Sequence, residues 1–362
     1  MKIGPVELPS PFVVAPMAGM TDTAFRRLVK RQGGCGLVVS EMVSSEGLVR
    51  GIDRTLEFAE FTEDERPVAI QIFGGDPLKM AEAARIVQGI GADIVDVNMG
   101  CPVPKIARHN AGCSLMREPN HAATIIEAMT RAVEIPVTVK MRAGWSDAER
   151  TAPTLARLVQ EAGAAAVAVH GRTAAQSYSG TADWGLVEQI AEGVSIPVFG
   201  SGDCVEPEQV VDRMRARIAG VLVGRGVLRN PWILAQAADL AAGRPPRVVS
   251  RAARGQFLLD YMDLLEDERV REPEGFRHTA PGALSAGDRA TDSPSSHDRW
   301  VVNKIRALAA YYTKGFEHGA QLRMDINRGD SLSYLRDLIV DFFSTHAGDT
   351  GPLGLAPTET RT

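Results

Sequence analysis

A cysteine that directly follows an apolar run is the residue of this sequence best placed to do chemistry. The run Ile94–Val97 predicts a short buried strand, and Asn98-Met-Gly-Cys-Pro102 follows it at once. Gly100 allows backbone conformations closed to other residues and Pro102 lacks an amide donor, so the strand must end here. The Cys101 thiol is therefore expected on a tight turn at the carboxyl end of a strand, where α/β proteins place their active sites. On position alone, a buried structural cysteine is an equal alternative.

Other chemically capable side chains follow predicted strands in the same way. Because the carboxyl ends of parallel strands meet at one edge, these residues are expected to form one constellation. The set suits an anionic cofactor, and it predicts no metal site, because no second His or carboxylate stands at ligand spacing. Its members are Gln71, Asn98, Cys101, Lys140, Arg142, His170, Arg172, Gly200-Ser-Gly-Asp203 and Gly224-Arg-Gly226.

Structural alternatives exist for each of these features. The two glycine turns follow the last two predicted strands, the usual phosphate site of a barrel, so phosphate binding is favoured over plain turns. Lys140 interrupts an apolar strand, where a buried charge needs a partner, so a ligand contact is favoured over snorkelling to the surface. His170 is equally consistent with a core histidine. A phosphate site, a lysine and a glutamine together suit flavin mononucleotide (FMN), whose anionic reduced ring the lysine would stabilise.

The elements that must position this constellation alternate regularly as far as about Leu240. Eight apolar runs, each followed by a crossover, predict an α/β fold, a (β/α)8 TIM barrel. An open doubly wound sheet is disfavoured, because G-x-G-x-x-G is absent after the first strand. The predicted strands are Phe12–Ala15, Leu37–Ser40, Val68–Ile72, Ile94–Val97, Val137–Met141, Ala166–Val169, Val198–Gly200 and Gly220–Val223. The predicted helices are Thr21–Gln32, Asp76–Gln88, His121–Ala132, Thr151–Ala162, Trp184–Glu192, Glu206–Arg215 and Asn230–Leu240, with a partly irregular crossover at Ser44–Phe61.

Beyond the barrel the pattern is helical without strands. We expect a catalytic barrel domain over residues 1–243, a linker at Arg244-Pro-Pro-Arg247 and a C-terminal all-helical domain over 244–346. Helical periodicity marks residues 251–270, 299–313 and 332–344. The segment 273–297 is rich in Gly, Pro, Ser and Asp without apolar period, which predicts a disordered insertion, and 347–362 is expected to be a flexible tail.

Composition excludes several classes of protein. The 362 residues are 44% hydrophobic and 23% charged, with a net charge of −5, which is typical of a soluble globular chain. No apolar run approaches the roughly 18 residues of a membrane span. The four cysteines show neither zinc nor disulfide spacing, and the N-terminus lacks a signal-peptide pattern, so we expect a cytoplasmic protein.

Eight motifs of the sequence together resemble one family, the tRNA-dihydrouridine synthases, and most closely its bacterial DusB-like branch. They occur in the family's order and spacing over about the first 240 residues, which makes the match far more specific than any single motif. The motifs are APMAGMTDTAFR from Ala15, SEMVSSEGL from Ser40, QIFGGDP from Gln71, DVNMGCPVPKI from Asp96, VTVKMRAGW from Val137, VHGRT from Val169, GSGD from Gly200 and LVGRGVLRNPWI from Leu222.

The resemblance implies an FMN-dependent, NADPH-driven reduction of uridines in tRNA to 5,6-dihydrouridine by a monomer. It implies hydride transfer from flavin N5 to C6 of the base and proton transfer from the catalytic acid Cys101 to C5. Residues expected to contact the flavin are Pro16, Met17, Ala18, Gln71, Lys140, His170, Ser201, Gly202, Asp203, Gly224 and Arg225. Residues expected to contact the substrate are Asn98 and Arg142 at the base, and Lys304 and Arg306 in the helical domain, which resembles the family's RNA-binding domain.

Some features depart from the family's pattern or stay open. Ser201 stands where many relatives carry Asn, and Cys113 takes a place usually held by a small residue, which suggests a packing thiol. Basic residues exceed acidic ones between Arg299 and Arg328, and Tyr311 and Tyr312 are candidate stacking surfaces, although a solvated helix face explains any single residue equally well. The rival functions are an FMN barrel acting on a free pyrimidine and a catalytically idle RNA-binding protein.

Overall fold

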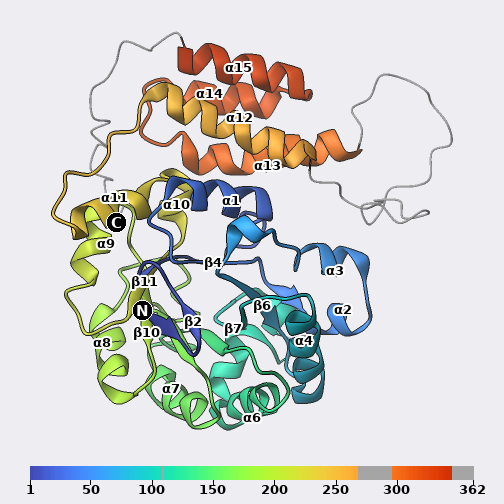
Figure 1. The fold of residues 1–362 in the computed structure, drawn as a ribbon, viewed down its shortest axis with the longest axis vertical. Coiled ribbons are helices and arrows are strands. Elements are labelled where there is room, and N and C mark those ends of the chain that lie inside the picture. Colours follow the sequence, from blue (N-terminus) through green and yellow to red (C-terminus); the bar gives the residue numbers. More distant parts are fainter. Residues whose placement is uncertain (108–109, 268–295, 345–362) are drawn as a thin grey trace. The chain divides into compact units, whose positions relative to one another are not determined.

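The computed structural model describes residues 1–107, 110–267 and 296–344 (Figure 1). The chain divides into two units, residues 1–247 and 248–362. The expected linker belongs to the first unit, because the guanidinium groups of Arg244 and Arg247 both bind the Asp239 carboxylate, at 2.9 and 2.8 Å. The expected insertion at 273–297 lies, up to residue 295, outside the described ranges, and so does the expected tail at 347–362.

A closed barrel of parallel strands forms the first unit, which confirms the (β/α)8 prediction. The strand order is β4-β3-β11-β10-β9-β8-β7-β6, and β4 also pairs with β6, so the sheet has no free edge among these strands. The short strand β5 (Val43–Ser44) extends the pairing of β6. The barrel strands are β3 (Phe12–Val14), β4 (Leu37–Val39), β6 (Val68–Phe73), β7 (Ile94–Met99), β8 (Val137–Arg142), β9 (Ala166–His170), β10 (Val198–Ser201) and β11 (Gly220–Val223).

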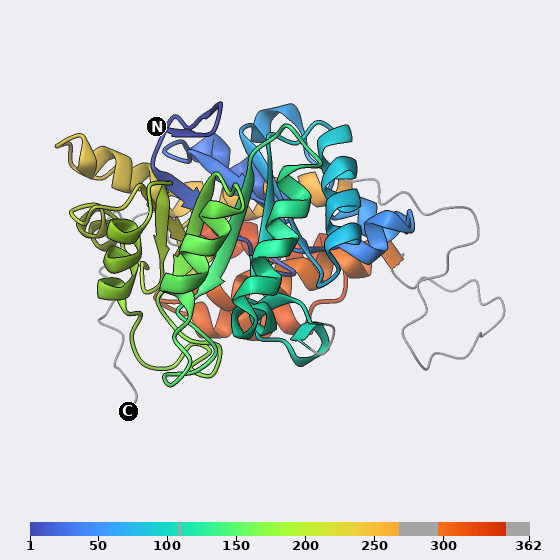
Figure 2. The same cartoon turned by 90° about the horizontal axis from the view of Figure 1, so that it is seen from below.

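Helices surround the strands of this unit (Figures 1 and 2). Their starts follow the predicted signals: Asp76 accepts hydrogen bonds from the Leu78 and Lys79 amides, and Pro77 occupies the first helical position. The longer helices are α1 (Thr23–Gln32), α4 (Pro77–Gly89), α6 (Pro119–Thr130), α7 (Ala152–Glu161), α8 (Trp184–Gly193), α9 (Pro207–Arg213) and α11 (Ile233–Ala241). The shorter ones are α2 (Ser45–Val49), α3 (Asp53–Glu57), α5 (Pro104–Ala107), α10 (Arg225–Arg229) and two 3-10 turns, Glu63–Glu65 and Gly112–Arg117.

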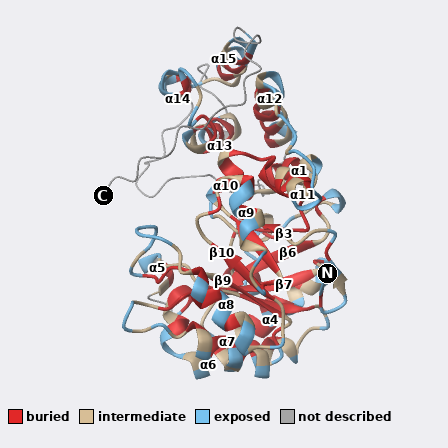
Figure 3. Cartoon of the chain, turned by 90° about the vertical axis from the view of Figure 1, so that its left-hand side faces the viewer, coloured by how far each residue is buried: buried red, intermediate tan, exposed pale blue. Residues whose placement is uncertain are grey.

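Successive side chains of each strand point alternately into the barrel and toward the surrounding helices, and both faces are buried (Figure 3). The inner face is apolar at the strands' amino ends, where Leu37, Ile94 and Phe199 belong to one buried cluster. A hairpin of β1 (Lys2–Ile3) and β2 (Val6–Glu7), which the sequence patterns did not predict, adds Ile3 and Leu8 to this cluster. The hairpin therefore closes the end of the barrel opposite the predicted site.

Four helices make up the described part of the second unit. They are α12 (Arg251–Asp267), α13 (Ser296–Tyr312), α14 (Gly319–Arg328) and α15 (Leu332–Ser344), of which α14 was not predicted. Helices α12 and α15 approach closely because Gly255 has no side chain. A Cβ at this position would lie only 2.6 Å from Cβ of Phe343. None of the helices in the described ranges has the length and apolar character needed to cross a lipid bilayer.

A buried ion pair fastens α1 to the segment before β6. Arg26 and Glu65 are 1% and 0% exposed, and the Arg26 guanidinium donates to the Glu65 carboxylate. Glu65→Gln leaves the buried guanidinium without its counter-charge, so the free energy of unfolding should fall by about 3 kcal/mol in urea titrations. Glu82→Gln, which breaks an exposed pair with Arg85, is the matched control and should change little. Equal effects of the two substitutions would contradict this account.

Candidate active site

Strand register brings the predicted polar residues to one end of the barrel. On the inner face, Asn98 of β7 is the register partner of Lys140 of β8, and Arg142 is the partner of His170 of β9. His170 in turn pairs with Ser201 of β10. Because successive side chains alternate between faces, a lysine, an arginine and a histidine converge inside the barrel mouth.

The turn that carries Cys101 is held from two directions. The Asn98 side-chain oxygen accepts hydrogen bonds from the Gly100 amide (3.1 Å) and the Cys101 amide (2.9 Å), which makes an Asx turn at the strand end. From the other side, the Cys113 amide donates to the Cys101 carbonyl at 3.1 Å. Gly112 has φ +61°, and a Cβ there would lie 2.8 Å from the same carbonyl oxygen. The thiol is therefore presented by a rigid turn and is only partly buried.

Electrostatics favour the protonated form of this thiol. Burial raises the pKa of Cys101, and the nearby charges of Arg142 and Lys140 offset this only in part. Burial likewise raises the pKa of Cys113 to about 11, with the Cys101 thiol as a second cause. At neutral pH both thiols carry their protons, so Cys101 is suited to donate a proton and poorly suited to attack as a thiolate.

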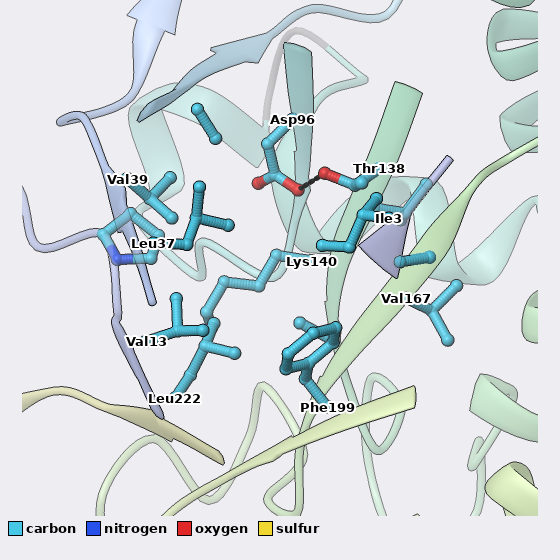
Figure 4. Close-up of a pocket in the computed structure, with 15 residues that line it drawn as sticks. Ile3, Val13, Leu37, Val39, Asp96, Thr138, Lys140, Val167, Phe199 and Leu222 are labelled. Carbon is cyan, nitrogen blue, oxygen red and sulfur yellow. Dashed lines mark hydrogen bonds between the residues drawn. The ribbon is translucent and has the colours of Figure 1, made fainter. Parts of the chain in front are cut away.

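Lys140 lies on the inner face of the barrel. It lines a cavity of about 30 Å³, room for about one water, together with Asp96, Thr138, Pro16 and apolar side chains (Figure 4). Burial, with the Arg142 charge as the next cause, lowers the pKa of Lys140 to about 8. Burial raises the pKa of Asp96, against the opposing effects of its hydrogen bonds and of Lys140. The lysine therefore stays mostly charged at neutral pH in a largely apolar surrounding.

His170 carries a buried ring nitrogen that no other group in the described part of the protein satisfies. Its Nε2 is buried and has no hydrogen-bond partner, and Nη1 of Arg172 is in the same condition. Burial and then the positive charges of Lys140, Arg142, Arg172 and Arg225 lower the pKa of His170 to about 2. A neutral imidazole with an unused ring nitrogen among cations is what a bound anion would satisfy.

The two glycine-rich turns lie beside this cationic group. Gly202 has φ +129°, and a Cβ there would come within 3.3 Å of the His170 ring. Asp203 has φ +56°, and its carboxylate binds Arg172 at 2.7 Å and the Ala182 amide at 2.7 Å, so it holds its own loop in place. A Cβ on Gly224 would lie 3.7 Å from Met17 Sδ, which places the segment Pro16–Ala18 against the second turn. Glycine at these two positions therefore lets the first turn pass close to His170 and the second close to Met17.

Two residues expected at the substrate base use their polar groups inside the protein. Arg142, 4% exposed, donates to the carbonyls of Gly100 (2.9 Å), Thr173 (3.0 Å) and Ser177 (2.9 Å). It therefore ties the Cys101 turn to the loop after β9. Asn98 donates to the Gln71 side chain at 2.8 Å, besides accepting from the turn. Contact of either residue with a base stays a prediction.

Tyr178 is a residue of this region that the sequence reasoning missed. It is 57% exposed, and the guanidinium carbons of Arg225 and Arg142 lie 4.3 and 5.7 Å from its ring centroid. Its ring is 6.4 Å from that of His170. The available signal was an aromatic residue in the segment that follows the predicted strand Ala166–Val169.

The residues of the helical unit that were expected to contact RNA differ in their surroundings. Lys304 lies over the Trp300 ring at 5.6 Å. Arg306 donates to the Gly329 carbonyl at 2.8 Å and so links α13 to the end of α14. The expectation that Tyr312 offers a stacking surface is wrong, because it is 0% exposed, packs on Phe257 and donates to the Arg254 carbonyl.

The depressed pKa of His170 has a consequence for acid stability. In the unfolded chain the ring takes up a proton near pH 6.5, whereas in the folded protein it does so only near pH 2. Between these values the unfolded state binds more protons, so stability falls with falling pH, by at most about 1.4 kcal/mol per unit. His170→Gln should therefore lose about 2 kcal/mol less than the parent between pH 7 and 5, in urea titrations of ligand-free protein. Identical pH dependence in both proteins would contradict this.

Solved structures with a similar fold include redox enzymes of low sequence identity. A histamine dehydrogenase from Rhizobium matches with a TM-score of 0.51 and 13% identity, over 72% of this chain and 50% of that one. A 2-naphthoyl-CoA reductase matches with a TM-score of 0.51 and 14% identity, over 73% and 55%. At such identities the likeness shows the fold alone.

Sequence comparison is far more specific. The family model for dihydrouridine synthase matches residues 13–284. A tRNA-dihydrouridine synthase B of Xanthomonas campestris is 39% identical over 313 residues, covering 86% of this chain and 93% of the relative. A tRNA-dihydrouridine synthase B of Pseudomonas aeruginosa is 44% identical over 237 residues, covering 64% and 70%. The motifs, the barrel and these matches agree, and the chain belongs to the dihydrouridine synthase family.

Proposed function

We propose that this protein reduces uridines of tRNA to 5,6-dihydrouridine, with FMN as its bound cofactor and NADPH as the reductant. Family membership supports the reaction and the tRNA substrate. The choice of FMN and of NADPH rests on the resemblance of the motifs and on the chemistry of the barrel mouth. Because tRNA is the substrate, we place the enzyme in the cytoplasm.

The residues present fit a flavin phosphate and ring. His170 Nε2 and Arg172 Nη1 are buried nitrogens without a hydrogen-bond partner among the described residues, at the turns Ser201–Asp203 and Gly224–Arg225. Arg172 Nη1 is a donor, and His170 Nε2 is one in the tautomer that carries its proton there. These groups would hold the phosphate end, since backbone amides and cations at strand ends favour phosphate oxygens. Lys140 and Gln71 would face the ring, and Pro16–Ala18 would line it. Gln71 uses one amide hydrogen and one oxygen lone pair internally, so one of each remains.

Cys101 would supply the proton of the reaction. Reduced FMN, when bound, supplies the hydride to C6 of the uracil ring. The developing negative charge at C5 and O4 then needs a proton, and Cys101 holds one because burial raises its pKa. The rigid Asx turn fixes the thiol's position, and the base must leave its stack to reach it.

The helical unit would bind the tRNA backbone. Phosphate contacts dominate affinity for nucleic acids, and α13 and α14 carry a local excess of basic residues despite the chain's net charge of −5. Lys304, whose amine lies over the Trp300 ring, would add positive charge beside an aromatic surface. Arg306, which already binds the Gly329 carbonyl, would act chiefly by holding the α13–α14 packing.

The observation that carries this proposal is a protonated thiol on a rigid turn beside a cationic group that contains an unpartnered buried histidine nitrogen.

The test uses purified full-length protein, whose flavin is released by acid and identified by mass spectrometry. The protein is then incubated with NADPH and with tRNA that lacks dihydrouridine, and nucleosides are quantified. We expect FMN and NADPH-dependent dihydrouridine. Turnover of free uridine but not tRNA would favour the small-molecule enzyme, and absence of both flavin and product would refute the proposal.

A further inference from the structure

A continuous chain of hydrogen bonds connects the barrel interior to the Cys101 turn. The Thr138 hydroxyl donates to one oxygen of Asp96 at 2.6 Å, and Nε2 of Gln71 donates to the other at 2.7 Å. The Gln71 oxygen accepts from the Asn98 amide nitrogen at 2.8 Å. The Asn98 oxygen then accepts from the backbone amides of the turn. The chain crosses three neighbouring strands, β6, β7 and β8, on their inner faces.

The direction of every bond in this chain follows from its first acceptor. Both Asp96 oxygens act as acceptors here, one from the Thr138 hydroxyl and one from Gln71, so Gln71 must turn its nitrogen toward Asp96. That orientation points the Gln71 oxygen at Asn98, which must then present its own nitrogen and leave its oxygen for the turn. If either amide rotated by half a turn, Asn98 would offer a donor to two backbone donors, and the Asx turn could not form.

We propose that Asp96 is a positioning residue, which sets the orientation of the Gln71 and Asn98 amides and thereby the turn that presents Cys101. This inference rests on the proposed function only in its catalytic consequence; the orientation of the turn stands on the bonds themselves. Asp96 is 6% exposed, and its two oxygens accept hydrogen bonds from Gln71 and Thr138. It therefore acts through these two side chains and does not touch the substrate.

An alternative role for Asp96 is purely electrostatic, as a counter-charge to Lys140. The two roles separate because an asparagine at position 96 removes the charge but can keep the direction of the chain. Its oxygen would accept from Gln71, and its nitrogen would donate to the Thr138 hydroxyl, since a hydroxyl both donates and accepts. With valine at position 138, the nitrogen of Asn at position 96 would lose that acceptor. The asparagine amide could then take either orientation, and those of Gln71 and Asn98 would no longer be fixed.

The test is therefore a double-mutant cycle of Asp96→Asn and Thr138→Val in the holoenzyme. Each single variant should keep dihydrouridine formation from pre-reduced enzyme within about three-fold of the parent. The double variant should lose about 100-fold, the effect of a displaced catalytic group, while reduction by NADPH stays within about three-fold. Thr130→Val, which removes a threonine hydroxyl bond to the Ala162 carbonyl, is the matched control and should leave both steps unchanged.

A second readout does not depend on the enzyme's activity. Alkylation of Cys101 by iodoacetamide, followed by peptide mass spectrometry across a pH series, reports the exposure and pKa of the thiol. In the double variant the loosened turn should shift the alkylation profile to lower pH and speed the reaction several-fold at pH 8, whereas the single variants should match the parent. A double variant no worse than the product of the single effects, or an unchanged alkylation profile, would overturn the proposal. If the parent forms no dihydrouridine, the alkylation arm still decides the positioning role.

Discussion

Replacing Cys101 with alanine should abolish most product formation while leaving the flavin chemistry intact. A general acid contributes typically about 100-fold or more, so dihydrouridine formation from pre-reduced enzyme should slow at least that much. FMN content and NADPH-dependent reduction should stay near the parent's, because neither needs the thiol proton. Stopped-flow reduction followed by nucleoside mass spectrometry separates the two steps. Unchanged product formation would rule out the acid role.

Cys113 provides the control for this experiment. It is fully buried and its backbone contacts the Cys101 turn, but its raised pKa of about 11 reflects a thiol enclosed by the protein. Cys113→Ala should therefore keep product formation within a few-fold. The pH profile gives an independent check: since burial raises the pKa of Cys101, product formation should stay constant through neutral pH and fall only above the ordinary thiol range. A fall that starts near pH 7 would contradict a protonated acid.

Local sequence patterns were enough to predict the barrel. Strands covered on both faces are apolar throughout, and helices between them begin at signals such as Asp76-Pro77, so both kinds of element are marked by their own residues. The predicted strand Val137–Met141 ends one residue later, at Arg142. Once the strands alternate with helices, closure into a barrel places Lys140, His170 and Cys101 at one end without further information.

The hydrogen-bond partner of each polar side chain could not be predicted from such local patterns. Whether Asn98 faces a base or the protein depends on Asp96 and Gln71, which lie across the sheet, and no periodicity encodes the direction of an amide. The same limit applies to Tyr312, whose ring is buried against Phe257 of α12 and Phe316. Alternation did hold a usable signal: Asp96 lies two residues before Asn98, on the same face.

The hairpin of β1 and β2 shows a different limit. Its strands are two residues long, which is too short for alternation to be detected. The hairpin is stabilised by tertiary packing, since Ile3 is 2% exposed within the buried cluster at the amino ends of the barrel strands. Elements that are stabilised mainly by a distant partner leave little trace in their own residues.

Lys140 is expected to govern the reduction step, and its substitution should have the second large effect. Lys140→Met keeps the aliphatic stem inside the barrel and removes the charge. Loss of one preorganised charge costs about 100-fold where negative charge develops, so reduction of the bound FMN by NADPH should slow by that order, and less FMN should be retained on purification. Lys79→Met, which removes an exterior lysine paired with Glu46, is the control and should change neither. A yellow Lys140→Met protein with normal reduction kinetics would refute the role.

The pH dependence of the same step tests the charge itself. The pKa of Lys140 is lowered to about 8, so the amine is charged below that pH and neutral above it. The negative charge of a bound anionic ring favours the charged form of the lysine and so moves the inflection upward. In the parent, the reduction rate should therefore be constant below pH 8 and fall about tenfold per unit above the inflection, as the fraction of charged lysine falls. In Lys140→Met the same profile should be flat at its low value, because no titrating charge remains. An inflection that persists in the variant would assign the titration to another group and remove Lys140 from the reduction step.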